Sequence, residues 1–275
     1  MRLPPLRVLL LSGLVLPLPP AAAETLLARY EVQAGGFAVL RLEAAFDLDG
    51  PRYRVRARIT TAGLAGLLSS SDQTTFSEGA WRGAEPVPDR YRVDGNWRGG
   101  RRRVAIDYAP GGMPLLRALE PPPEADREAV PEALMRNTMD TLSALAKLTR
   151  MVATTGRCEA TAAVYDGRRR VDYTVRTEGL ERLPQDGGFG GEALRCGVES
   201  RLLAGRRNDQ DTAEARQPQP ATAWLATVAP ARQPLPVRVE LSNRWFGTIR
   251  VVLLGVQADA GASGASGQDS AQQRR

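Results

Sequence analysis

The sequence predicts a mainly β protein, built as a single large curved antiparallel sheet or incomplete β-barrel, with one amphipathic helix packed on it or in it. Three observations predict this fold. Apolar and polar residues alternate with the period of a strand in most segments after residue 24. Turn residues such as Gly35-Gly36 and Asp49-Gly50-Pro51 separate these segments at short intervals, as in an antiparallel meander. Only residues 131–152 show the spacing of a helix.

The first half of the chain contains the clearest strand patterns, and we expect strands at residues 25–33, 37–48, 52–59, 74–81, 89–93 and 101–108. Residues 52–59 alternate arginine with Tyr53, Val55, Ala57 and Ile59. A strand points the apolar set to the core and the four guanidinium groups to solvent or to acidic neighbours. We interpret this arginine ladder as a solvated outer face, and a stripe that contacts anions or lipid headgroups is the alternative.

The helical segment has apolar residues at spacings of three and four: Leu134, Met135, Met139, Leu142, Leu145, Leu148 and Val152. The pattern fits one amphipathic helix or a broken pair. Asp140 is a candidate N-cap for the second piece, because its carboxylate can accept hydrogen bonds from the amides of residues 142 and 143. Packing against one sheet is the ordinary expectation, and a plug or lid over the open side of a curved sheet is the alternative.

The second half of the chain contains a convincing hairpin, in which residues 158–165 and 168–177 flank the Asp166-Gly167 turn. We expect closing strands at 223–228, 237–241 and 248–256, with a turn at 245–247. Residues 63–68 fit a short helix or an apolar loop. Residues 110–127, 205–220 and 258–275 are predicted to lack regular structure, because they are rich in Pro, Gly or polar residues.

The first 23 residues have the pattern of a cleaved secretory signal, with Arg2 and Arg7 before an apolar run and Ala21-Ala22-Ala23 at its end. The apolar run is shorter than the roughly 20 residues of a spanning helix, so we expect no transmembrane segment. Cleavage after Ala23 predicts a periplasmic protein in a Gram-negative cell, with release from the cell as the alternative. The predicted organisation is a signal peptide (1–23), a single β-rich domain (24–257) and a disordered tail (258–275).

The two cysteines, Cys158 and Cys196, both lie in the part of the chain that is predicted to be exported. Thiols in such compartments are normally oxidised, so we expect the two residues to form a disulfide. The disulfide would close a loop of 39 residues. In the loop-entropy model, closing such a loop stabilises the protein by roughly 3–4 kcal/mol.

The chain contains no histidine, which excludes a Ser-His-Asp triad and every histidine-containing zinc site. We expect no metal, no cofactor and no enzymatic activity. Three catalytic alternatives remain: a Ser143–Lys147 pair, a tyrosine, and Asp140 with Asp166 as an acid and base acting on a glycan. The net charge of +6 does not predict a nucleic-acid partner, because arginines are interleaved with acidic residues.

Several short motifs resemble those of an exported bacterial family known as domain of unknown function 3108. The matching motifs are Tyr30-Glu31-Val32, Asp140-Thr141-Leu142-Ser143, Cys158 with Val164-Tyr165-Asp166-Gly167-Arg168-Arg169-Arg170, Ala193-Leu194-Arg195-Cys196, and Pro236-Val237-Arg238-Val239-Glu240. The resemblance covers about residues 26–256. The sequence departs from the family pattern at Thr141, where proline is more usual. The family is similar in shape to the half-barrels of periplasmic lipoprotein carriers. The resemblance implies an apolar cavity partly covered by helices, and it implies no catalytic residue.

Together these observations favour a non-enzymatic periplasmic binding or carrier-like protein for a hydrophobic, lipid-like or other cell-envelope ligand. The alternative is a structural or accessory factor in envelope maintenance, whose basic face contacts an envelope protein or an acidic polymer. A carboxylate-based glycan hydrolase is a third hypothesis. The candidate ligand-binding residues are Asp140, Ser143, Asp166, Arg168, Arg169 and Arg170.

Overall fold

A computed structural model describes residues 25–63, 66, 70–122, 126–243 and 247–258. The predicted signal peptide, most of residues 63–68 and most of the 245–247 turn lie outside these residues. The predicted tail also lies outside them except for Ala258, which is the last residue of a strand and not part of a disordered tail. The described elements are β1 (Leu26–Ala34), β2 (Phe37–Asp47), β3 (Arg52–Thr61), β4 (Asp72–Arg82), β5 (Glu85–Trp97), β6 (Gly100–Tyr108), β7 (Pro114–Glu120), η2 (Glu132–Leu134), α2 (Thr141–Thr155), β8 (Ala160–Tyr165), β9 (Arg170–Leu183), β10 (Gly191–Ala204), α3 (Thr212–Ala215), β11 (Gln219–Ala226), β12 (Leu235–Asn243) and β13 (Gly247–Ala258).

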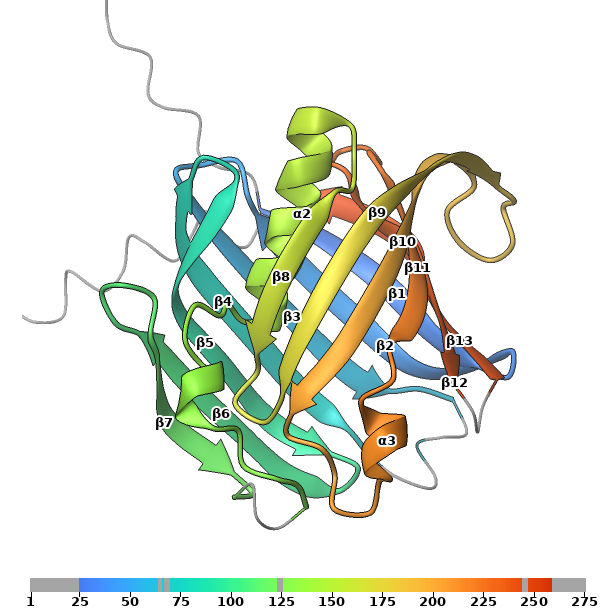
Figure 1. Ribbon diagram of the computed structural model, residues 1–275. Coiled ribbons are helices and arrows are strands. Elements are labelled where there is room, and N and C mark those ends of the chain that lie inside the picture. Colours follow the sequence, from blue (N-terminus) through green and yellow to red (C-terminus); the bar gives the residue numbers. More distant parts are fainter. Residues whose placement is uncertain (1–24, 64–65, 67–69, 123–125, 244–246, 259–275) are drawn as a thin grey trace, which may run out of the picture.

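The described strands form one antiparallel sheet in the order β7-β6-β5-β4-β3-β2-β1-β13-β12-β11-β10-β9-β8. Strands that are consecutive in the chain pair with each other, except that β7 does not pair with β8. The first and last strands, β1 and β13, also pair. The sheet curls so that β8, β9 and β10 lie opposite β1 to β4 (Figure 1). The edge strands β7 and β8 do not pair with each other, so the fold is the predicted incomplete β-barrel.

Helix α2 connects the β8 edge to the opposite wall of the curved sheet at one end. It packs against β8 on one side and against β3, β4 and β5 on the other. Met139, just before the helix, forms a parallel bridge with Val164 of β8. The side chain of Lys147 donates to the carbonyl of Thr161 on β8 at 2.9 Å and pairs with Glu85 on β5 at 2.8 Å. The helix therefore holds the unpaired edge strand β8 against β3, β4 and β5.

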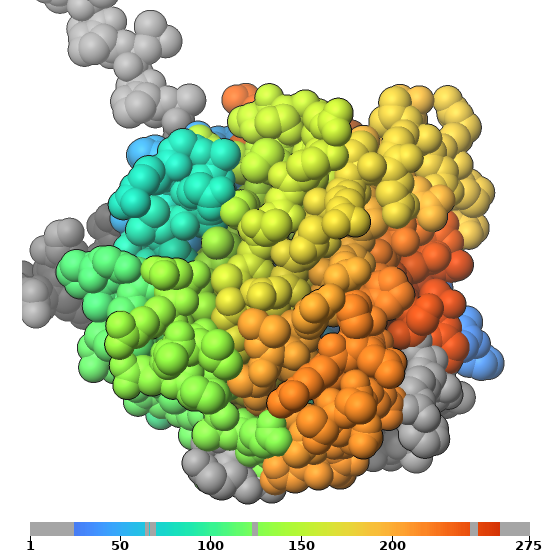
Figure 2. All heavy atoms as spheres, viewed as in Figure 1, coloured from blue at the N-terminus to red at the C-terminus, as the bar shows by residue number. Residues whose placement is uncertain are grey.

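A second connection bridges the gap at the other end. The segment after β7 and the segment after β10 meet in an antiparallel bridge between Arg127 and Arg207. The Glu128 amide donates to the Arg206 carbonyl at 2.9 Å, and the side chains of these two residues form an ion pair at 2.6 Å. In the space-filling view, side chains cover most of the face between these two connections (Figure 2). The sheet thus encloses an interior although its edges are unpaired.

The arginine ladder of β3 has the predicted orientation. Tyr53 and Val55 are 1% and 0% exposed, whereas the alternating arginines are exposed. Acidic residues of β4 and β5 neutralise three of the four arginines. The ion pairs are Arg54–Glu78 and Arg58–Asp72 with β4, and Arg52–Asp89 with β5. Most of this outer face is therefore a network of exposed ion pairs.

Two segments that were predicted to lack regular structure contain strands or a helix. Residues 114–120 form edge strand β7, which pairs with β6 through a register shift between Ala105 and Ile106. Its sequence does not alternate, and pairing with β6 supplies the order that the pattern does not indicate. Residues 205–220 contain α3 and the start of β11. The predicted helical segment forms two separate helices, the short η2 and then α2, as the alternative of a broken pair expected. Strand β10 was not among the expected strands.

The predicted disulfide joins Cys158 and Cys196. Cys196 lies on β10 opposite Thr177 of β9, and the hydroxyl of Thr177 accepts a hydrogen bond from the Cys158 amide at 2.8 Å. The bond therefore crosses β9 and ties the start of the β8 edge to β10. Both cysteines are 0% exposed and pack with Val152 of α2 and with Leu225.

Candidate ligand-binding cavity

The curved sheet encloses a cavity of about 780 Å³ between its inner face and the first turns of α2. Strict alternation points one side chain in two toward this interior, so successive strands contribute rows of apolar residues. The apolar and aromatic part of the lining consists of Tyr30, Leu42, Ala44, Phe46, Val55, Ala57, Ile59, Tyr91, Val93, Trp97, Val104, Leu142, Leu145, Pro236, Val239 and Val251. The inner wall of the sheet is therefore largely hydrophobic.

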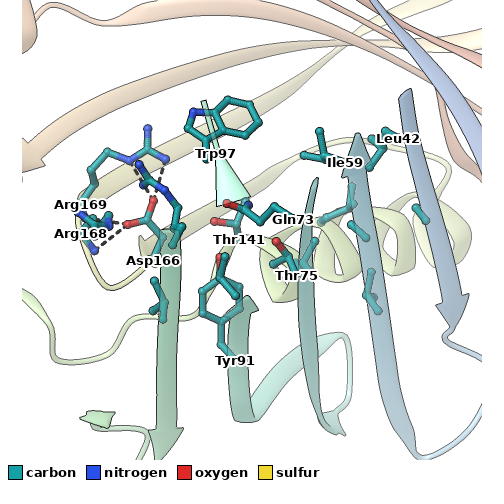
Figure 3. A pocket seen from close by; sticks show the side chains of 18 of the residues that line it. Leu42, Ile59, Gln73, Thr75, Tyr91, Trp97, Thr141, Asp166, Arg168 and Arg169 are labelled. Carbon is teal, nitrogen blue, oxygen red and sulfur yellow. Dashed lines mark hydrogen bonds and ion pairs between the residues drawn. The ribbon is translucent and has the colours of Figure 1, made fainter. Parts of the chain in front are cut away.

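One side of the cavity is charged. We define the arginine cluster as six lining residues whose charges interact: Arg102, Asp126, Arg127, Asp166, Arg168 and Arg169. They come from β6, from the segment after β7 and from the β8–β9 turn, which the two connections across the gap bring together. In Figure 3, Arg168, Arg169 and Asp166 lie on one side, Leu42 and Ile59 lie on the opposite side, and Trp97, Gln73 and Tyr91 lie between them. The cavity is therefore amphipathic.

The β8–β9 turn fixes the orientation of Asp166. Its side chain accepts hydrogen bonds from the backbone amides of Arg168 and Arg169 at 2.9 and 2.8 Å, as an Asx turn does. It also forms an ion pair with the Arg169 guanidinium at 2.7 Å. Burial acts to raise the pKa of Asp166, but the charge and hydrogen bonds of Arg169 and these amides together hold that pKa below its usual value. Asp166 is thus an ionised, paired carboxylate.

Gly167 allows this turn to approach β6 closely. Its φ of +88° suits glycine, and a Cβ atom at this position would lie 2.6 Å from Cγ1 of Val104. The contact places Arg168 and Arg169 beside Arg102, whose position on β6 is two residues before Val104 on the same face.

Arg168 and Arg102 differ in their hydrogen-bond and ion-pair partners. The guanidinium of Arg168 is buried and donates to the carbonyl of Pro121 and to Asp126, the latter at 3.3 Å. Arg102 is half-buried, and it forms no ion pair with any residue in the described ranges; its Nε has no hydrogen-bond partner there. Burial and the charge of Arg127 lower the pKa of Arg102, and burial and the charge of Arg102 lower the pKa of Arg168. The cluster therefore holds an excess of incompletely compensated positive charge.

Asp140 and Ser143 lie in a buried polar network beneath the start of α2. The Asp140 carboxylate accepts from the amides of Leu142 and Ser143, both at 2.9 Å, which confirms its role as the helix N-cap. It also accepts from the hydroxyls of Ser143 at 2.5 Å and Ser77 at 2.9 Å. The hydroxyls of Ser143 and Tyr53 are 2.7 Å apart. This network attaches the helix to β3 and β4.

The structure brings only part of the predicted site together. Asp166, Arg168 and Arg169 line the cavity. Asp140 and Ser143 are 0% exposed and do not line it, and Lys147 bonds to Thr161 and Glu85 and not to Ser143. Arg170 points elsewhere, because its guanidinium donates to the carbonyl of Leu134 at 2.9 Å and pairs with Asp172.

Arg102 was not among the predicted site residues, although the sequence contains a signal for it. The alternation that points Val104 and Ile106 inward also places Arg102 on the inner face. Asp126 and Arg127 gave no such signal, because they lie in a segment that was predicted to be irregular. Only the bridge to the segment after β10 places them at the cavity.

None of the described helices has the length and apolar character needed to cross a membrane. No group of three His, Cys, Asp or Glu side chains within the described ranges is arranged to hold a metal ion.

The fold and the cavity define a class of protein: a curved, incompletely closed antiparallel sheet with a helix across its gap and an amphipathic hollow inside. The chain belongs to the DUF3108 family, described as proteins of unknown function, whose model matches residues 28–254. No curated protein matches the chain.

Two solved structures are similar to this chain. One is a β-barrel-like protein of domain of unknown function DUF1849 from Brucella abortus, with 12% identity and a TM-score of 0.49, covering 87% of this chain and 100% of that one. The other is described as a "putative lipoprotein" from Parabacteroides distasonis, with 11% identity and a TM-score of 0.34, covering 86% of this chain and 97% of that one.

Proposed function

We propose that this protein is a non-enzymatic binding or carrier-like protein that holds a hydrophobic, lipid-like ligand in the cavity of the curved sheet. The observation that carries the proposal is the 780 Å³ interior with its apolar wall. Its volume lies within the roughly 300–1,000 Å³ of small-molecule sites, which are mostly apolar with a few placed polar groups. A protein that needed only a stable core would gain by filling this space.

A binding role fits the chemistry of the lining better than a catalytic one. The two carboxylates of the lining, Asp126 and Asp166, both form ion pairs with arginine. A general acid in glycan hydrolysis needs a raised pKa, whereas the pKa of Asp166 is lowered. Asp140, the other half of the hydrolase hypothesis, has no accessible surface.

Filling the cavity should weaken ligand binding. Ala44 lines the cavity on β2 and is 4% exposed, so an Ala44→Trp side chain would occupy space that the ligand needs. We expect its affinity for the neutral probe N-phenyl-1-naphthylamine, measured by fluorescence titration, to fall at least about tenfold, which corresponds to ~1.4 kcal/mol.

The matched control is Ala45→Trp, which makes the same change at the next residue on the opposite face of β2 and should leave the affinity unchanged. Ala57→Trp, on the neighbouring strand, serves if Ala44→Trp does not fold. Wild-type protein that does not take up the probe, or cavity variants that bind it as tightly as wild type, would contradict the proposal.

The second part of the proposal is that the protein acts outside the cytosol. The Cys158–Cys196 disulfide supports it, because such bonds persist in oxidising compartments. Expressed in a Gram-negative host, the protein should be recovered from the periplasmic extract with the mass of a chain that begins at Glu24 and contains no free thiol. Intact-mass measurement checks both points, and a chain that keeps residues 1–23 and stays in the cytosol would contradict export.

A further inference from the structure

The arginine cluster contains more positive charge than the described residues neutralise. Its four arginines face two aspartates, which leaves an excess of two positive charges on one side of the cavity. Asp126 is shared by Arg127 at 3.4 Å and Arg168 at 3.3 Å, and Asp166 is taken by Arg169. Arg102 therefore has no carboxylate of its own within the described ranges.

Hydrogen-bond donors without partners lie in this cluster. Nε of Arg102 and Nε of Arg168 are buried donors that make no hydrogen bond to any described residue. Both residues line the cavity. Buried polar groups are ordinarily satisfied, and exceptions need an explanation such as a ligand.

The burial of like charges points to an anion. Burial lowers the pKa of both Arg102 and Arg168, and the charge of Arg127 lowers both further; the charge of Arg102 also lowers the pKa of Arg168. Burying neighbouring cations is unfavourable unless an anion compensates them. A guanidinium group also has the planar donor geometry that matches carboxylate and phosphate oxygens.

The structure assigns the arginine cluster as the site for the anionic head group of an amphiphile, a phosphate or carboxylate, whose hydrocarbon lies against the apolar wall of β2 and β3. This inference rests on the proposed function and names its ligand class. The arrangement in Figure 3 supports it, because the charged groups and the apolar residues lie on opposite sides of one cavity. Arg102 would bind the head group, and Arg168, which Asp126 and Pro121 already hold, would be its fixed neighbour.

The test compares ligands that share one oleoyl chain and differ in the head group. Lysophosphatidic acid carries a phosphate, oleic acid a carboxylate, and monooleoylglycerol neither. Each competes with bound N-phenyl-1-naphthylamine, and inorganic phosphate alone is a further competitor. We expect at least one anionic lipid to bind about tenfold or more tightly than monooleoylglycerol, with an affinity that falls as salt rises, and we expect inorganic phosphate to compete weakly.

The decisive variant is Arg102→Gln, with Arg103→Gln as its control on the outer face of the same strand. Arg102→Gln should remove the advantage of the anionic lipid, about tenfold, and leave monooleoylglycerol binding unchanged, while Arg103→Gln changes neither. Arg102→Lys should retain part of the advantage, and it serves if Arg102→Gln does not fold.

Equal binding of charged and neutral lipids by wild type, an equal loss of both in Arg102→Gln, or binding of inorganic phosphate as tight as that of the phospholipid would overturn the inference. In the first two cases uptake of the neutral probe still supports the proposed function. Failure of the wild-type protein to take up any probe would refute the proposed function itself.

Discussion

Replacing Asp140 with alanine should destabilise the protein by about 3 kcal/mol, because one carboxylate supports both the start of α2 and the buried network beneath it. Loss of an N-cap alone costs about 1 kcal/mol, and one buried hydroxyl proton left without an acceptor costs about 1–3 kcal/mol more, because Ser77, Ser143 and Tyr53 can still bond to one another. Ser77 and Ser143 would lose this acceptor. Urea unfolding at pH 7 checks the value, and a loss below about 1 kcal/mol would mean that other contacts hold the helix.

Asp140→Asn separates the effect of charge from the effect of capping, because asparagine is an equally good N-cap. Burial raises the pKa of Asp140 above its usual value of 3.8, against the opposing hydrogen bonds from Ser143 and Ser77. A raised folded-state pKa means that folding takes up a proton between the two pKa values.

The stability of wild type relative to Asp140→Asn should therefore be greatest below pH 3.8, fall as the pH rises through the raised pKa, and become constant above it. Unfolding of both proteins across this range measures the difference. A relative stability that increases with pH would show that the hydrogen bonds outweigh burial and that the pKa is lowered.

Removing the disulfide should cost about 3–4 kcal/mol, because the bond restricts a long loop of the unfolded chain. The double variant Cys158→Ala/Cys196→Ala leaves small apolar residues at two buried positions and tests this value by urea unfolding. The loss should appear with little change in ligand affinity, because neither cysteine lines the cavity.

Reduction of the wild-type protein with dithiothreitol provides the control. It should lower wild-type stability by a similar amount and leave the double variant unaffected. A double variant as stable as the oxidised wild type would show that strand pairing and the cluster around Val152 already fix the β8 edge.

Much of the strand structure was predictable because its cause is local. The alternation in residues 52–59 determines which side chains of β3 are buried, and the Asp166-Gly167 turn determines the hairpin of β8 and β9. The N-cap role of Asp140 follows equally from its position before an apolar helical stripe. Strand β7 was missed, because its pattern lacks alternation and its order comes from pairing with β6.

The sequence by itself determined the fold class, the disulfide pair and the family, because strand period, turn chemistry and short motifs are written in neighbouring residues. The resemblance already implied an apolar cavity, but the tertiary structure alone decided that Arg102, Asp126 and Arg168 meet at one side of it. These three residues come from β6, a connecting segment and a distant turn, and only the curl of the sheet and the two connections across its gap bring them together. Their proximity depends on contacts between segments far apart in the chain, which no local periodicity records.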